Sequence, residues 1–128
     1  MRNVQLTLSV LDDLFSVCRL APDAGIPHWV PTEGFISVTR TADELSIVCQ
    51  SDSVPETVWA ERDFRVLKIE GPLDFSLTGI LLAVAGPLAE AGISIFAVST
   101  YDTDYVLVKK NDLKKAVSVL QLSGHTVG

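Results

Sequence analysis

The chain lacks several features that would assign it to a functional class at once. Its 128 residues contain no apolar run close to the ~20 residues that a membrane-spanning helix needs. Its ten basic residues form no stripe of Lys and Arg, and sixteen acidic residues outnumber them, which gives a formal charge of -6. Nucleic-acid binding depends on such a basic surface. We therefore expect neither a membrane nor a nucleic acid among the partners of this protein.

Cysteine and histidine are also scarce. Cys18 and Cys49 lie among apolar residues without the C-x-x-C spacing of a redox or metal site. This pattern favours buried, reduced thiols, and it leaves a disulfide between the two as an alternative. The two histidines, His28 and His125, have no partners at the spacing of a zinc site. We expect no metal site built on these residues.

Catalytic motifs are missing as well. No serine stands in a G-x-S-x-G setting, and the glycines near residues 71 and 79 match neither common phosphate-binding loop. Nothing pairs a nucleophile or general base with an orienting partner. The start of the chain leads directly into a strand pattern without the regions of a signal peptide. The sequence thus predicts a cytoplasmic protein that is not an enzyme and holds no cofactor.

The residues that are present give a rich apolar pattern. Hydrophobic residues make up 48% of the chain and the mean hydropathy is +0.35. With no membrane span to hold these residues, the fold or a second subunit must bury them. Period-two and β-rich runs predict strands over 4–10, 35–40, 45–49, 65–69, 93–99, 105–109 and 125–127. Helical spacing and caps predict helices over 11–20, from near Pro55, from Ser76 or Thr78 to Gly92, and from Asp112 to Gly124.

The two halves of the chain repeat this plan at a distance of 60 residues. FISVTRTADELSIV in the first half aligns with IFAVSTYDTDYVLV in the second. Each half thus predicts the β-α-β-β-α-β order of a ferredoxin-like unit. We expect an α+β protein with two such units in tandem, over 1–62 and 63–128, with antiparallel sheets and helices on one face. Units of this size are marginal alone, so they should fold together.

Two features of the second half make local predictions. Gly86-Pro87 should bend or split the helix that contains it, because proline has no amide hydrogen and crowds the carbonyl four residues before it. Gly92 and Gly124 should close the two helices in the left-handed conformation.

A polar corner, residues 100–104, joins the last two long strands. Its sequence TYDTD gathers hydroxyls, a phenol and two carboxylates, which can hydrogen-bond a small polar ligand. Asp102 and Asp104 also form a D-x-D pair, which turn chemistry explains better than a metal does. The corner predicts a binding site rather than a catalytic site.

Three segments of the second half carry a resemblance to a known family. They are Gly71 to Phe75, Thr78 to Ile80, and PLAEAGISIFAVSTYDTDYVLV from Pro87 to Val108. This half resembles the ACT domain, and more closely the tandem ACT proteins related to the CASTOR amino-acid sensors. The first half matches weakly, mainly through EGFISVTRTADELSIV. The resemblance implies a regulatory module that binds an amino acid at an interface between ACT units.

The resemblance also implies which residues touch the ligand. They are Asp74, Phe75 and Ser76 in a loop, Thr78 and Gly79 at a helix entrance, and Ser99, Thr100, Tyr101 and Asp104 at the corner. The free amides of the helix entrance suit a carboxylate, and Asp104 or Asp74 would pair with an ammonium or guanidinium group. Arginine sensors of this type carry an acidic residue just after the loop phenylalanine, where this chain has Leu77. A neutral or smaller amino acid is therefore at least as good a candidate as arginine.

The four-unit relatives suggest that two copies of this two-unit chain form a homodimer. The strands over 93–98 and 105–108 are apolar on both faces, which is more than one helix layer requires. A second function is also open: a non-catalytic dimerisation or protein-interaction module whose ligand site is vestigial. Its support is the first half, where Arg40, Thr41 and Asp43 stand at the positions of Thr100, Tyr101 and Thr103.

Overall fold

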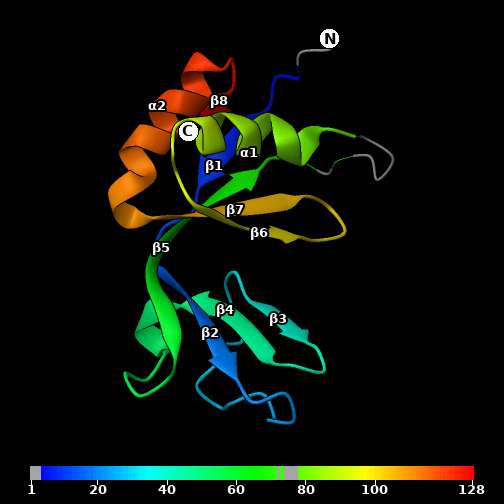
Figure 1. The fold of residues 1–128 in the computed structure, drawn as a ribbon, viewed down its shortest axis with the longest axis vertical. Helices are drawn as coiled ribbons and strands as arrows, with labels where there is room; N and C mark the ends of the chain where they lie inside the picture. The colour runs from blue at the N-terminus through cyan, green and yellow to red at the C-terminus, as the bar shows by residue number, and fades with distance from the viewer. Residues whose placement is uncertain (1–3, 72, 74–77) are drawn as a thin grey trace. The chain divides into compact units, whose positions relative to one another are not determined.

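The computed structural model describes residues 4–71, residue 73 and residues 78–128 (Figure 1). The chain divides into two compact units. Unit 1 contains residues 1–12 and 65–128, and unit 2 contains residues 13–64. Unit 2 is thus inserted into unit 1 along the chain, directly after the first strand. This division differs from the predicted tandem of 1–62 and 63–128, because the N-terminal strand pairs inside the unit formed by the second half.

Unit 1 holds both α-helices that the structure describes. From strand β5 onward its elements follow the β-α-β-β-α-β order predicted for the second half. The strand order is β6-β7-β5-β1-β8. The elements are β1 (Thr7–Val10), β5 (Ala60–Ile69), α1 (Ile80–Glu90), β6 (Ile95–Ser99), β7 (Asp104–Lys109), α2 (Leu113–Leu122) and β8 (Thr126–Val127).

Strand β1 makes the sheet of unit 1 mixed. It runs antiparallel to β5, with Leu8 opposite Ile69, and parallel to β8, with Leu8 opposite Val127. The prediction of purely antiparallel sheets is wrong at this edge. The reason is that a strand from the start of the chain occupies the place between β5 and β8.

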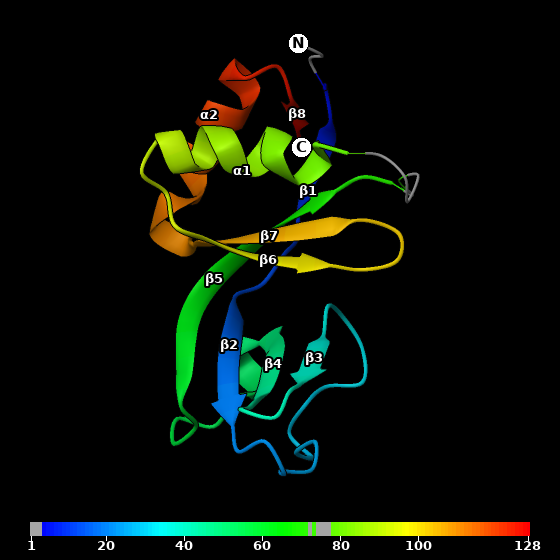
Figure 2. The ribbon, with the colours of Figure 1, turned by 45° about the vertical axis from the view of Figure 1, so that its right-hand side comes forward.

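Both helices of unit 1 pack on the same face of its sheet. Figures 1 and 2 show α1 and α2 on one side of β5, β6 and β7. Leu67 and Ile69 alternate along β5 with residues of the opposite face, and both belong to the core that the helices cover. The buried members of this core are Leu8, Leu67, Ile69, Ile80, Val84, Leu88, Ile93, Val106, Val108, Ala116 and Leu120. The helix layer predicted for the second half is confirmed.

Unit 2 is built from strands. β2 (Phe15–Leu20), β3 (Ser37–Arg40) and β4 (Leu45–Gln50) join the first part of β5 in the order β3-β4-β2-β5, all antiparallel. Residues 13–64, all of which the structure describes, contain no α-helix and a single short 3-10 turn, η1 (Ser51–Ser53). The irregular segments around 24–36 and 54–58 cover the core in place of helices.

Two helix predictions for the first half are therefore wrong. Residues 15–20 form β2, which pairs with β4 along its full length. Short apolar runs do not distinguish a strand from a helix, and here Asp13, with φ 80, prevents a helix from including the first residues. After Pro55 the chain makes a single turn, closed by the amide of Val58, and enters β5 at Ala60. Of the two predicted ferredoxin-like units, only the second is thus complete.

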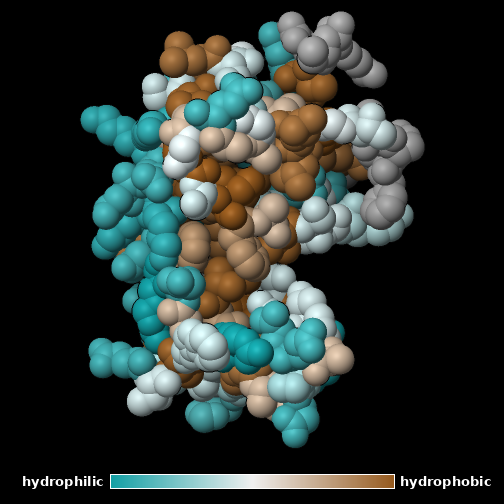
Figure 3. All heavy atoms as spheres, viewed as in Figure 1, coloured by the Kyte–Doolittle hydropathy of each residue, from teal (hydrophilic) through white to brown (hydrophobic). Residues whose placement is uncertain are grey.

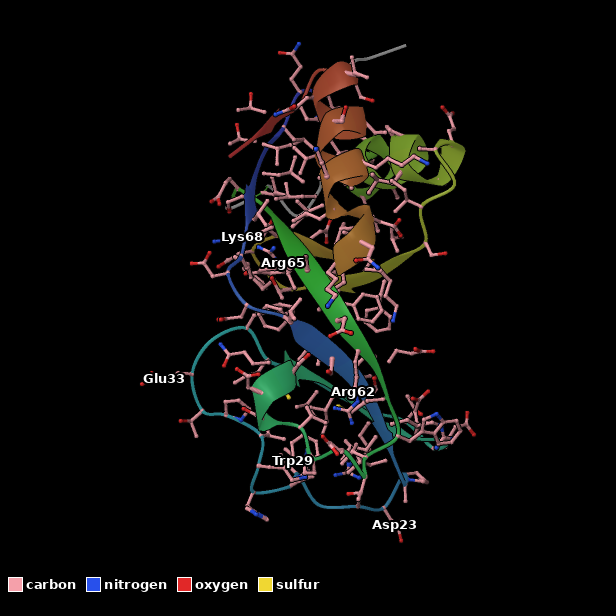
Figure 4. All side chains as sticks on the ribbon, turned by 90° about the vertical axis from the view of Figure 1, so that its left-hand side faces the viewer. Asp23, Trp29, Glu33, Arg62, Arg65 and Lys68 are labelled. Carbon is pink, nitrogen blue, oxygen red and sulfur yellow. The ribbon has the colours of Figure 1, made fainter. Side chains whose placement is uncertain are left out.

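Strand β5 contributes residues to both units and carries an irregularity where it passes from one to the other. Its register against β2 shifts between the pairs Phe15–Phe64 and Val17–Glu61. Asp63 lies in this bulge with φ 65, a left-handed conformation that Asp tolerates better than most residues. Figure 4 shows Arg62, Arg65 and Lys68 following one another along the strand.

Helix α1 runs unbroken through Pro87, although the sequence predicts a bend or a split there. Proline cannot donate to the carbonyl of Ala83, which lies four residues before it. The side chain of His125 supplies that hydrogen bond, with Nε2 at 2.9 Å from the Ala83 oxygen. His125 Nδ1 accepts from the amide of Leu6 at 3.1 Å, so the proton of the neutral ring is on Nε2. Gly124, with φ 98, ends α2 as predicted and directs His125 into this buried position.

This arrangement predicts that His125 stabilises the fold because residue 87 is proline and cannot donate to the Ala83 carbonyl. His125→Ala should lower the free energy of unfolding by about 2–4 kcal/mol, since it removes a buried side chain and leaves a part-buried amide and a part-buried carbonyl without this partner. In a Pro87→Ala background, residue 87 regains an amide that bonds Ala83, and the same change should cost about 1 kcal/mol less. Urea unfolding of the four proteins in this cycle measures the difference. If His125→Ala lowered the free energy of unfolding equally in both backgrounds, His125 would not be replacing the amide that Pro87 lacks.

Candidate functional site

The tip of the β6–β7 hairpin is a tightly closed turn. The amide of Thr100 donates to the carbonyl of Thr103 at 2.8 Å, and the Thr100 hydroxyl donates to the same oxygen at 2.9 Å. The amide of Thr103 in turn lies 3.3 Å from the Thr100 hydroxyl oxygen. The Thr100 hydroxyl, predicted to touch a ligand, is thus engaged in holding the turn.

Two bonds fasten this tip to the loop that follows β5. The hydroxyl of Thr103, which is 5% exposed, donates to the carbonyl of Ile69 at 2.6 Å. The amide of Leu73 donates to the carbonyl of Asp102 at 2.8 Å. Residues 29 and 34 positions apart in the sequence are therefore joined by these two bonds. The corner and the loop, both singled out by the sequence, lie together.

Gly71 permits this close approach. A Cβ atom at position 71 would lie 2.9 Å from the Leu73 amide nitrogen and 3.2 Å from the Asp102 carbonyl oxygen. Both of these atoms belong to backbone and take part in the bond between loop and tip, so neither can move away cheaply. Any side chain at position 71 would separate the two segments.

The start of α1 offers backbone amides without a side-chain cap. Gly79 is the N-cap residue, with φ 77, and no side chain bonds the first turn among the residues that the structure describes. The first helical bond runs from the amide of Ala83 to the carbonyl of Gly79 at 2.9 Å. The first turn also carries no acidic residue. Such a helix entrance suits the carboxylate of a small ligand.

The remaining predicted site residues fall into two groups. Ser99 and Asp104 are the last pair of the hairpin before its tip, and Tyr101 is 84% exposed at the tip itself. Thr78 is exposed beside Gly79. Asp74, Phe75 and Ser76 lie outside the described residues. The sequence analysis missed Thr103 and Gly71 as positioning residues; the only sequence signal for them was a glycine before a proline and a threonine within a turn.

The two cysteines lie together in the core of unit 2. Cys18 and Cys49 are both buried and free, and their side chains are hydrogen-bonded to each other. The bond from Cys49 lowers the pKa of the Cys18 thiol, and the same bond, with burial, raises the pKa of Cys49. The predicted burial is confirmed. Full enclosure by apolar neighbours suits a packing role for this pair.

In the described part of the chain, no three side chains of His, Cys, Asp or Glu gather as metal ligands. Neither helix in that part has the length and apolar character to cross a membrane.

Comparison with protein families assigns both units. A sequence model of the ACT domain matches residues 60–121, which run from β5 almost to the end of α2. A second model, which describes an N-terminal domain, matches residues 13–57 and thus nearly the whole of unit 2.

Individual relatives agree with this assignment. The human cytosolic arginine sensor for mTORC1 subunit 1 is 37% identical over 90 residues, which are 70% of this chain and 27% of that protein. The chain therefore spans about a quarter of the length of the curated relatives it matches. The crystal structure of protein Atu0741 from Agobacterium tumefaciens is 42% identical, with a TM-score of 0.92, and the match covers 98% of this chain and 93% of that one.

A more distant structure shares the fold. The regulatory subunit of aspartate kinase from Thermus thermophilus is 11% identical, with a TM-score of 0.59, over 95% of this chain and 99% of that one. The strand order, the two helices on one face and the sequence matches lead to one conclusion: the chain is an ACT domain protein related to the CASTOR family.

Proposed function

We propose that the chain is a regulatory module that binds an amino acid at the entrance of α1. The observation that carries the proposal is the fastening of the hairpin tip to the loop before α1, through Thr103 and Leu73. It holds the polar corner against the loop that leads to α1, a helix whose start has no side-chain cap. An ACT domain match and an arginine sensor among the relatives support the choice of an amino acid over other small ligands.

Each part of the amino acid has a counterpart in this proposal. The carboxylate takes the first amides of α1, directly after Thr78 and Gly79. The ammonium group pairs with Asp104, which lies at the hairpin end nearest the tip, or with Asp74. Tyr101 and Ser99 border the ligand from the hairpin, and Phe75 and Ser76 complete the proposed set of ligand residues. A neutral amino acid fits this set because Leu77 replaces an acidic residue.

The proposed site lies at an interface between ACT units, supplied by two copies of the chain. We infer a homodimer, since the strands over 93–98 and 105–108 are apolar on both faces, which is more than one helix layer requires. The alternative function, an interaction module with a vestigial site, has support in the exposed apolar side chains of unit 1. Leu82 on α1 is 70% exposed and Leu122 at the end of α2 is 86% exposed.

A screen of the twenty amino acids tests the binding proposal. At a hundredfold excess over Kd, a ligand of the folded state stabilises it by about 2.7 kcal/mol, which raises Tm by several degrees. We expect such a rise with one or a few neutral amino acids. Asp104→Ala should abolish the rise and leave the unliganded Tm within a few degrees, because Asp104 lies at the hairpin end.

Asp43→Ala is the matched control, since Asp43 occupies the tip of the β3–β4 hairpin in unit 2. It should leave the ligand response intact. No response of the wild-type chain to any amino acid at millimolar concentration would overturn the binding proposal and favour the interaction module.

Gly71→Ala tests whether the loop and the tip act as one site. The added Cβ should push Leu73 away from Asp102, lower the free energy of unfolding by about 1–3 kcal/mol and weaken the ligand response. Gly86→Ala is the control: its Cβ would meet only a Leu82 side chain, at 3.7 Å, and an alanine inside a helix should stabilise by up to about 1 kcal/mol. Urea unfolding with and without the ligand measures both. If Gly71→Ala, like Gly86→Ala, neither lowered the free energy of unfolding nor weakened the ligand response, the contact between Leu73 and Asp102 would not support the site.

A further inference from the structure

The charge of the chain is divided unevenly between its units. Residues 13–64, which form unit 2, carry nine acidic and three basic side chains and thus the whole formal charge of -6. The rest of the chain carries seven of each. Four of its lysines fall within seven residues, from Lys109 to Lys115, at the start of α2. The chain therefore has a basic patch on one unit and an acidic surface on the other.

The lysines border an apolar groove on the outer side of α2. The groove has a volume of about 560 Å³ and is lined by Lys110, Leu113, Lys114, Val117, Ser118 and Gln121. The spacing of these residues places them along one face of the helix. Hydrophilic side chains line the outer side of α2 in Figure 3, and Figure 4 shows the helix from that side.

Two of these lysines are available for a partner. Lys115 is occupied, since its Nζ donates to the carbonyl of Ala91 at the end of α1 at 2.8 Å. Lys110 and Lys114 are exposed, and neither has a carboxylate within ion-pair distance in the part of the chain that the structure describes. The half-buried side chains of Leu113 and Val117 form the apolar floor between them.

Unit 2 presents a side chain that fits such a groove. Trp59 is 74% exposed, the most exposed aromatic side chain of unit 2 among the residues described. The guanidinium of Arg19 lies 5.3 Å from its ring centroid and covers one face of the ring. Glu56, three residues before it, is exposed. The acidic surface of unit 2 complements the lysines of the groove, the exposed indole suits its apolar floor, and tryptophan is among the most frequent anchors of protein interfaces.

We propose that the α2 groove binds unit 2 of a second copy of the chain, with Trp59 on Leu113 and Val117 and with Glu56 beside Lys110 and Lys114. Each copy carries one groove and one Trp59, and the proposed dimer makes this contact twice. The inference rests on the self-association in the proposed function and identifies the surface that makes it. None of the groove residues belongs to the amino-acid site, so variants of the groove test the contact without changing a proposed ligand residue.

Light scattering coupled to size exclusion tests the contact on the full chain at 1–100 µM (about the range of weak to moderate dimers). We expect the wild type at twice the monomer mass of 13.8 kDa. Trp59→Ala and Lys114→Glu should each weaken the dimer about tenfold or more. Glu56→Lys should do the same alone, and the double variant K114E/E56K should restore the dimer. Glu33→Lys, an equal charge change in another loop of unit 2, should leave the mass unchanged.

The outcomes separate this inference from the proposals on which it rests. A monomeric wild type at every concentration would overturn the homodimer, the groove contact and the placement of the amino-acid site between two copies. The amino-acid screen would still decide whether the chain binds an amino acid. A wild-type dimer that all three single variants preserve would overturn the groove contact alone. Circular dichroism of each variant confirms the fold, and a dimer lost by K114E but not regained by K114E/E56K would contradict the pairing with Glu56.

Discussion

The hydrogen bond from the Thr103 hydroxyl to the Ile69 carbonyl is the contact on which the candidate site depends. It is buried and 2.6 Å long, and it joins the hairpin tip to the end of β5. The bond from Leu73 to Asp102 continues the attachment into the loop. Without these bonds, the polar corner would be an ordinary exposed hairpin tip. With them, it is held against the loop that leads to α1, a helix whose start has no side-chain cap.

A hydrogen bond from another part of unit 1 stabilises the middle of α1. Pro87 removes an amide from α1, and His125 returns a donor to the Ala83 carbonyl from beyond the end of α2. Because His125 also accepts from Leu6, one ring connects α1 with the chain leading into β1. The hydrogen bond that Pro87 cannot donate is thus replaced by one from His125, which explains why a helix with an internal proline is continuous.

The sequence predicted unit 1 well and unit 2 poorly, for physical reasons. Unit 1 has long periodic helices and glycine stops such as Gly92 and Gly124, which leave little choice of structure. In unit 2 the six apolar residues around Val17 suit a helix or a strand, and only the pairing of β2 with β4 decides between them. The place of β1 between β5 and β8 is likewise a long-range choice that no local pattern records.

For the site, the sequence supplied the segments but not their connection. The corner 100–104 and the helix entrance at Gly79 were both identified, and the structure adds the bonds through Thr103 and Leu73 that join the corner to the loop. Thr100 shows what the sequence cannot decide. The polar composition of the corner suggested that Thr100 contacts a ligand, whereas its hydroxyl closes the turn. A hydroxyl can serve a ligand or the backbone, and geometry alone distinguishes the two uses.

Amide hydrogen exchange at Leu73, followed by NMR, tests most directly whether the tip and the loop are joined. The account predicts that the Leu73 amide is protected in the wild type, because it donates to Asp102. It also predicts that Thr103→Val, which removes the hydroxyl and keeps the shape, strongly reduces this protection. A Leu73 amide that exchanges in the wild-type chain as fast as in an unfolded peptide would contradict the account.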